Sequence, residues 1–208
     1  RRMDELCALL DGLPDLQELS PHAQVLAQCV RALAMLVHAD HAALPLALKQ
    51  ARRLSAETGI INLDGINAMA YAVSRVLAGD VEGGSAILQE ALAANQTKHY
   101  FMGVTLELAQ SWIAAWKGSA SSLQFAQMTR QCGRDSGLVM YEILGLTSEC
   151  VAAALLDLPD VAVRVAELRR LGKSGFLPYS AIHADLLDAW RLVRNGDEEA
   201  ALPYLQAG

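Results

Sequence analysis

Apolar residues recur every three or four positions along almost the whole chain, which is the spacing of an amphipathic helix. Ile66, Met69, Val73 and Val76 form one such row. Alanine and leucine, which favour helix, are abundant, and the β-branched residues that favour strands are sparse. The sequence therefore predicts an all-α protein.

Helix breaks recur at regular intervals, each followed by a residue that favours the start of the next helix. They stand at Ala39-Asp40, Gly79-Asp80, Gly118-Ser119, Pro159-Asp160 and Gly196-Asp197. Their second residues are 40, 39, 41 and 37 positions apart. A second series of breaks falls between them, at Gly59, 95–99, Gly137 and Gly175. The chain is therefore expected to repeat a pair of helices about every 40 residues.

The first helix of each pair is expected at 22–38, 61–78, 100–117, 139–157 and 178–195. The second helix is expected at 41–57, 81–95, 120–135 and 161–173, and a fifth one opens at Asp197. The repeats would span 22–59, 60–98, 99–137, 138–175 and 176–208, with residues 1–13 closing an earlier repeat. We expect residues 1–208 to form a single helical-repeat domain, a fragment of a longer chain in which the fifth repeat is truncated.

Small residues recur in the second helices, where such a helix would cross closely over the first one. Gly84 and Ala91 take these places in the second repeat. In the first, third and fourth repeats the later place holds Ala51, Arg130 and Leu171, and in the fifth repeat the earlier place holds Ala201. This pattern resembles the tetratricopeptide repeat. The resemblance implies a right-handed superhelical solenoid of antiparallel helix pairs with one concave and one convex face.

The expected repeats are longer than the ordinary tetratricopeptide unit of about 34 residues. Long helix pairs with the cadence of residues 77–92 resemble the sensor region of MalT-like transcription activators, the large ATP-dependent members of the LuxR group. That resemblance implies an ATP-binding module upstream, a helix-turn-helix DNA-binding domain downstream, and a segment that senses an effector and mediates self-association or contact with a regulatory protein. A stand-alone tetratricopeptide scaffold or chaperone that binds a peptide or protein is the alternative.

One polar row on the first helices is the candidate site. Positions eleven and eight residues before Ala39, Gly79, Gly118 and Gly196 share one helix face. With residues at the edge of this face, the candidates are Gln28, Arg31, Tyr71, Arg75, Glu107, Gln110, Trp112, Asp185 and Asp188. In solenoids these helices line the concave face, so this polar row would form a groove for a small-molecule effector or a peptide. A plain solvated face on each amphipathic helix is the other interpretation.

Composition and charge narrow the possible partners. The chain has 208 residues, of which 53% are hydrophobic, and a formal net charge of -6. That charge disfavours direct contact with nucleic acid, and charged residues interrupt every apolar run before it could span a membrane. The four cysteines are far apart in sequence, which predicts neither disulfides nor a zinc knuckle and favours the cytoplasm.

No motif in the sequence predicts catalysis. Gly172-Lys173-Ser174 resembles the end of a phosphate-binding loop, but Glu167 stands where that loop needs a glycine. His38 and His41 flank Asp40 without a third ligand beside them. We therefore expect neither an enzyme nor a bound metal or cofactor.

Two expectations concern apolar side chains. Trp112, Trp116 and Trp190 are expected to pack in the core between repeats, because a binding role would require an exposed ring. The last helix pair is expected to expose Ala200, Leu202 and Leu205, and with them a tendency to associate end to end.

Overall fold

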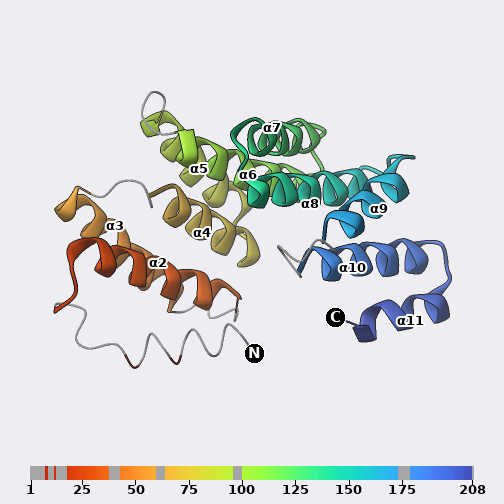
Figure 1. Cartoon of the computed structure of the whole chain (residues 1–208), viewed down its shortest axis with the longest axis horizontal. Coiled ribbons are helices and arrows are strands. Elements are labelled where there is room, and N and C mark those ends of the chain that lie inside the picture. Colours follow the sequence, from red (N-terminus) through yellow and green to blue (C-terminus); the bar gives the residue numbers. More distant parts are fainter. Residues whose placement is uncertain are drawn as a thin grey trace. The chain divides into compact units, whose positions relative to one another are not determined.

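The computed structural model describes residues 8, 12, 18–37, 43–59, 64–95, 100–172 and 179–207. Within these ranges every extended regular element is an α-helix, and none of them contains a strand (Figure 1). The expectation of an all-α protein is confirmed for this part of the chain. None of the helices described there is long and apolar enough to cross a lipid bilayer.

The helices lie where the sequence predicts them, within three residues at either end. The first helices of the pairs are α2 (Pro21–Val37), α4 (Asp64–Leu77), α6 (Tyr100–Trp116), α8 (Val139–Leu155) and α10 (Tyr179–Arg194). The second helices are α3 (Leu44–Thr58), α5 (Val81–Asn95), α7 (Ser121–Ser136), α9 (Val161–Gly172) and α11 (Glu198–Ala207). The predicted end of an earlier repeat at 1–13 falls almost entirely outside the described residues.

The helices form two compact units, Arg1–Ala109 and Gln110–Gly208. In the first unit α2 packs on α3, α3 on α4 and α4 on α5, and α2 also touches α4 (Figure 1). In the second unit α7 packs on α8, α8 on α9, α9 on α10 and α10 on α11, and α8 also touches α10. Each unit is therefore built from helices that contact their neighbours in sequence and the next helix of the same kind.

The first helices end in one recurring turn that sharpens the predicted period. Gly79, Gly118, Asp157 and Gly196 each have a positive φ, between 58° and 88°, just after α4, α6, α8 and α10. In the first of them the Gly79 N–H donates to the Val76 carbonyl at 2.9 Å and the Asp80 N–H to the Arg75 carbonyl at 2.8 Å, a Schellman motif. These four residues are spaced by 39 positions each time. We call this spacing the 39-residue register.

The residue after the turn also begins the next helix, as its type predicts. The Asp80 carboxylate accepts a hydrogen bond from the Gly83 N–H at 2.8 Å at the start of α5. The Asp197 carboxylate accepts one from the Ala200 N–H at 3.3 Å at the start of α11. Both aspartates therefore satisfy an N–H group that the first helical turn leaves without a backbone partner.

Small residues allow close helix crossings. A Cβ on Gly84 would lie 2.6 Å from the carbonyl oxygen of Ala72, so α5 crosses α4 at backbone contact and the expected small residue is required there. Between α7 and α8 the glycine is on the other helix, because a Cβ on Gly145 would lie 2.5 Å from the Arg130 backbone nitrogen. The third repeat therefore accommodates Arg130, where an alanine is expected, through Gly145 on α8.

The described cysteines behave as small core residues. Cys29 and Cys150 are buried, Cys132 is partly buried, and none of the three is in a disulfide. The Cys29 thiol donates to the side-chain oxygen of Asn67 at 3.1 Å. Burial raises the pKa of Cys150 to about 12, so this thiol stays protonated near neutral pH and is a poor nucleophile.

Candidate functional site

In the first unit the polar row consists of residues with different environments. Gln28 and Arg31 on α2 are partly exposed. Tyr71 on α4 is partly buried and packs against a core cluster of Leu44 and Leu48 from α3 and Ala70. The eighth position before the end of α4 is therefore turned toward the preceding second helix.

Two more members of the polar row belong to the first unit, Arg75 on α4 and Glu107 on α6. Arg75 is exposed, and its guanidinium donates to the carboxylate of Asp80 just beyond the end of α4. Glu107 on α6 is partly buried, and that burial raises the pKa of its carboxyl above the ordinary value. Arg75 therefore holds the turn that ends α4, whereas Glu107 is a partly desolvated acid.

In the second unit the polar row takes part in contacts between helices. Gln110 is partly exposed. The Trp112 indole N–H donates to the Ser148 hydroxyl at 2.7 Å. Asp185 and Asp188 accept hydrogen bonds from one guanidinium nitrogen of Arg169 on α9, at 2.6 and 2.9 Å. The structure therefore brings the two aspartates together around a single cation.

The polar row has members in both units, and the groove that they were expected to form together stays a prediction.

Within the second unit, the 39-residue register adds one member of the polar row that the sequence analysis missed. Glu149 on α8 lies eight residues before Asp157, as Asp188 lies eight residues before Gly196. It was missed because α8 ends at an aspartate rather than at a glycine. The structure shows that Asp157 ends α8, and counting eight residues back from Asp157 identifies Glu149.

Glu149 is the buried centre of a cluster of charges. Its side chain is 4% exposed and accepts hydrogen bonds from Arg130 of α7 at 3.2 Å and from Arg164 of α9 at 2.7 Å. Arg130, which is 11% exposed, also donates to Glu167. We call the cluster the charged layer. Its members are Arg130, Arg134, Glu142, Glu149, Asp160, Arg164 and Glu167.

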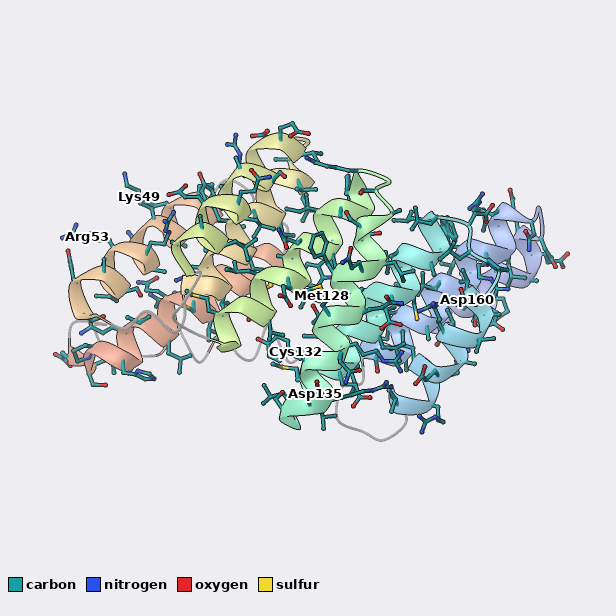
Figure 2. All side chains as sticks on the ribbon, turned by 90° about the horizontal axis from the view of Figure 1, so that it is seen from above. Lys49, Arg53, Met128, Cys132, Asp135 and Asp160 are labelled. Atoms are coloured by element: carbon teal, nitrogen blue, oxygen red, sulfur yellow. The ribbon has the colours of Figure 1, made fainter. Side chains whose placement is uncertain are left out.

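Every acid of the charged layer has an arginine partner. Arg134 donates to Glu142 at 2.8 Å, and Arg164 pairs with Asp160 at 2.7 Å. The hydrogen bond from Arg164 holds the pKa of Asp160 below its ordinary value. The hydrogen bonds between its guanidinium and carboxylate groups join α7, α8 and α9. Figure 2 shows Asp160 at the turn before α9.

An inter-helix ion pair is itself repeated. Arg130 pairs with Glu149, and Arg169 pairs with Asp188 at 2.9 Å, each 19 positions further along the chain. Both arginines and both acids are related by the 39-residue register. In both cases an arginine on the second helix of one pair forms an ion pair with an acid on the first helix of the following pair, at equivalent positions of the register. The sequence signal was Arg130, which stands where an alanine is expected, whereas in the fourth repeat the sequence analysis assigned that place to Leu171 rather than to Arg169.

The three tryptophans differ in exposure. Trp112 and Trp190 are partly buried, and Trp190 packs against the core cluster around Ile143 and Leu146. Trp116, expected in the core, is 61% exposed, so that expectation is wrong for this residue. It is the last residue of α6 and is followed by an exposed turn at Lys117.

The remaining predictions concern the last helix pair and the motifs. Leu202 and Leu205 are exposed as expected, whereas Ala200 is partly buried. His38, His41, Lys173 and Ser174 lie outside the described residues. Among the residues described, no group of three or more His, Cys, Asp or Glu side chains could hold a metal ion.

Comparisons with protein-family models, with curated proteins and with solved structures give no match to this chain.

Proposed function

We propose that this chain is a non-catalytic binding module, built as a right-handed solenoid of antiparallel, tetratricopeptide-like helix pairs. The observation that carries the proposal is the 39-residue register, in which four first helices end in the same left-handed turn. Equal repeats that pack on their neighbours stack into elongated structures whose surfaces bind ligands or partners. The repeated ion pairs Arg130–Glu149 and Arg169–Asp188 support the same architecture, because they join consecutive helix pairs in one way.

Within that architecture, the module senses an effector or holds a protein partner for a MalT-like transcriptional regulator. Four members of the polar row, namely Gln28, Arg31, Arg75 and Gln110, are the side chains we propose for this contact. An effector that prefers one spacing of neighbouring repeats would shift the population toward it. The resemblance of residues 77–92 to the sensor repeats of that family supports this assignment.

The regulator assignment is tested by the size of the natural polypeptide. An antibody raised against this chain is applied to an extract of the source organism. A band several times larger than 22.3 kDa, with ATPase and DNA-binding activities that copurify, is the expected result. A band at 22.3 kDa would contradict the regulator assignment and favour a stand-alone tetratricopeptide scaffold or chaperone.

The site assignment is tested by substitution. Replacing Arg31 and Arg75 by alanine is expected to weaken capture of the natural partner, while circular dichroism shows an unchanged helix content. Arg53, an exposed arginine on α3 that projects outward in Figure 2, provides the matched control through Arg53→Ala. Unchanged capture by the Arg31 and Arg75 variants would remove the polar row from the proposal.

A further inference from the structure

A pocket in the second unit lies between the α8–α9 turn and the last turn of α10. Its volume is about 350 Å³, at the small end of the range of roughly 300 to 1,000 Å³ that is typical of ligand sites. One part of the lining is apolar and includes Leu158, Val161 and Ala162. The other part includes Trp190, Arg191 and Arg194 from α10 and the carboxylate of Asp157 from the α8–α9 turn. The pocket therefore offers an apolar wall beside two cations.

The two arginines have hydrogen-bond donors to spare. Arg194 donates to Asp157 at 3.3 Å, and Arg191 donates to Asp188 at 3.1 Å. Each guanidinium carries five N–H groups, and neither arginine makes another hydrogen bond to the residues that the structure describes. Ion pairs this exposed hold their partners weakly. Both cations are therefore available to an incoming anion.

Trp190 fixes one of these cations and adds a polar group. The Arg194 guanidinium lies over the indole ring, 4.9 Å from its centroid, in a cation–π contact. Trp112 is the equivalent residue in the 39-residue register two repeats earlier, and its N–H donates to Ser148. The Trp190 N–H donates to none of the described residues. The wall of the pocket thus has a third donor without a partner in this part of the chain.

The charged residues of this pocket are not found at the equivalent positions of the other repeats. At the positions equivalent to Arg191 and Arg194 the earlier repeats have no arginine, and these positions hold Ser74, Leu77, Ile113, Trp116, Ala152 and Leu155. Asp157 has φ 58° where the equivalent residues Gly79, Gly118 and Gly196 are glycines. A left-handed conformation is unfavourable for a residue with a Cβ, and such departures cluster at ligand sites. Here the retained Asp157 carboxylate accepts a hydrogen bond from Arg194 at 3.3 Å.

We propose that this pocket binds a small organic acid. Its carboxylate would be held by the guanidinium groups of Arg191 and Arg194, and its apolar part would lie against Leu158, Val161 and Ala162. Planar guanidinium forks match a carboxylate with two parallel hydrogen bonds, and the apolar wall accounts for an organic acid rather than a bare inorganic ion. This site rests on the proposed function in that the chain is a binding module, and it names the chemical class of one ligand.

Benzoate, a carboxylate on an apolar ring, is the probe, and benzamide, its neutral analogue, is the matched control. Tryptophan indole N–H signals are followed by two-dimensional NMR during titration, after assignment with the Trp190→Phe variant. We expect benzoate to shift the Trp190 signal saturably, leaving the Trp112 signal in place, and benzamide to bind at least about tenfold more weakly.

Variants of the two arginines separate binding from folding. Arg191→Gln and Arg194→Gln are each expected to weaken benzoate binding about tenfold, and Arg194→Lys is expected to weaken it despite the retained charge. Arg170→Gln, an exposed arginine on α9, is expected to bind benzoate like the parent chain. Thermal unfolding of each variant confirms that it is folded.

Three results would overturn the proposal. They are the absence of a saturable Trp190 shift with benzoate, equal binding of benzoate and benzamide, and undiminished binding by folded Arg191→Gln and Arg194→Gln variants. Failure of this titration is distinguishable from failure of the proposed function, because capture of a partner through Arg31 and Arg75 does not involve the pocket.

Discussion

Tyr71 in the first unit packs through its ring against Leu44 and Leu48 of the preceding second helix. In the second unit two of the three equivalent places hold Glu149 and Asp188, which are ion-paired with arginines of the preceding second helices. One backbone register therefore supports an apolar contact in one unit and an ionic contact in the other. The apolar contact needs only surface to bury, whereas the buried ion pair also needs every charge to have a partner.

The difference between the apolar and the ionic contact affects which side chains are tolerated at this place more than it affects stability. Bringing two charges out of water offsets most of their attraction, so an ion pair such as Arg130–Glu149 adds little net stability over an apolar pair. A stranded charge, however, is strongly unfavourable. The second unit should therefore tolerate fewer single substitutions at this place than the first unit does.

The largest expected effect comes from Glu149. Replacing it by leucine leaves Arg130 and Arg164 facing an apolar side chain, and we expect a loss of about 3 kcal/mol in the free energy of unfolding, measured with urea. Glu142→Ala on the same helix removes a more exposed pair with Arg134 and is the control, with an expected loss of about 0.5 kcal/mol. Equal losses for the two variants would remove the distinction between buried and exposed pairs.

The close crossings give the next largest effect, and both units should show it. An added Cβ would meet backbone atoms of the facing helix at Gly84 in the first unit and at Gly145 in the second. We expect Gly84→Ala and Gly145→Ala each to lower the free energy of unfolding by about 1 to 2 kcal/mol, although alanine is the better helix former. Stabilisation by either substitution would show that the helices there are further apart than described.

A smaller effect is expected at the second ion pair. Asp188 and Arg169 are more exposed than Glu149 and Arg130, so water compensates more of a lost partner. Asp188→Ala should lower the free energy of unfolding by about 1 kcal/mol, well below the loss for Glu149→Leu. A loss as large as that of Glu149→Leu would mean that burial does not set the difference between the two pairs.

A gain in stability is expected at Asp157. Glycine adopts its left-handed conformation without strain, so Asp157→Gly should raise the free energy of unfolding by about 0.5 kcal/mol. Gly79→Ala at the equivalent place should lower it by about 1 kcal/mol. Thermal and urea unfolding measure both variants. Destabilisation by Asp157→Gly would show that the exposed pair with Arg194 outweighs the backbone conformation.

The smallest effect is a pH dependence that the two units share. The Gly83 N–H and Arg75 lower the pKa of Asp80 in the first unit, and Arg164 lowers the pKa of Asp160 in the second. An acid whose pKa is lowered on folding stabilises the protein above its unfolded value, and this stabilisation is lost as the pH falls through the folded value. Carboxyl signals followed by NMR should titrate below the ordinary aspartate range at both residues. A folded pKa at or above the ordinary value at either residue would contradict this.

The fold class and the helix positions followed from the sequence because the breaks between helices are local. Glycine allows a left-handed turn and Asp80 or Asp197 accepts from the next helix's N–H groups, whatever the rest of the chain does. The end of α8 was harder to place, because Asp157 adopts the left-handed conformation there that glycines adopt after the other first helices. The sequence indicated the break at Pro159-Asp160 instead, which shifted the expected period to 41 and then 37 residues.

The candidate site was less predictable, because its chemistry depends on contacts between helices. The sequence placed Asp185 and Asp188 on a polar row, but only the packing of α9 on α10 shows that Arg169 holds both. Glu149 carries no local sign in the sequence of its two arginine partners, which come from other helices. Amphipathic periodicity cannot distinguish a polar side chain in solvent from one that is paired inside.

We infer that Arg130 and Glu149 form one unit of packing between consecutive helix pairs. A double-mutant cycle with Arg130→Met and Glu149→Leu tests it most directly, because Arg164 keeps Asp160 as a partner in the double variant. We predict that each single variant loses about 3 kcal/mol and that the double variant recovers at least about 2 kcal/mol of the summed loss. Losses that simply add, within about 0.5 kcal/mol, would contradict the account.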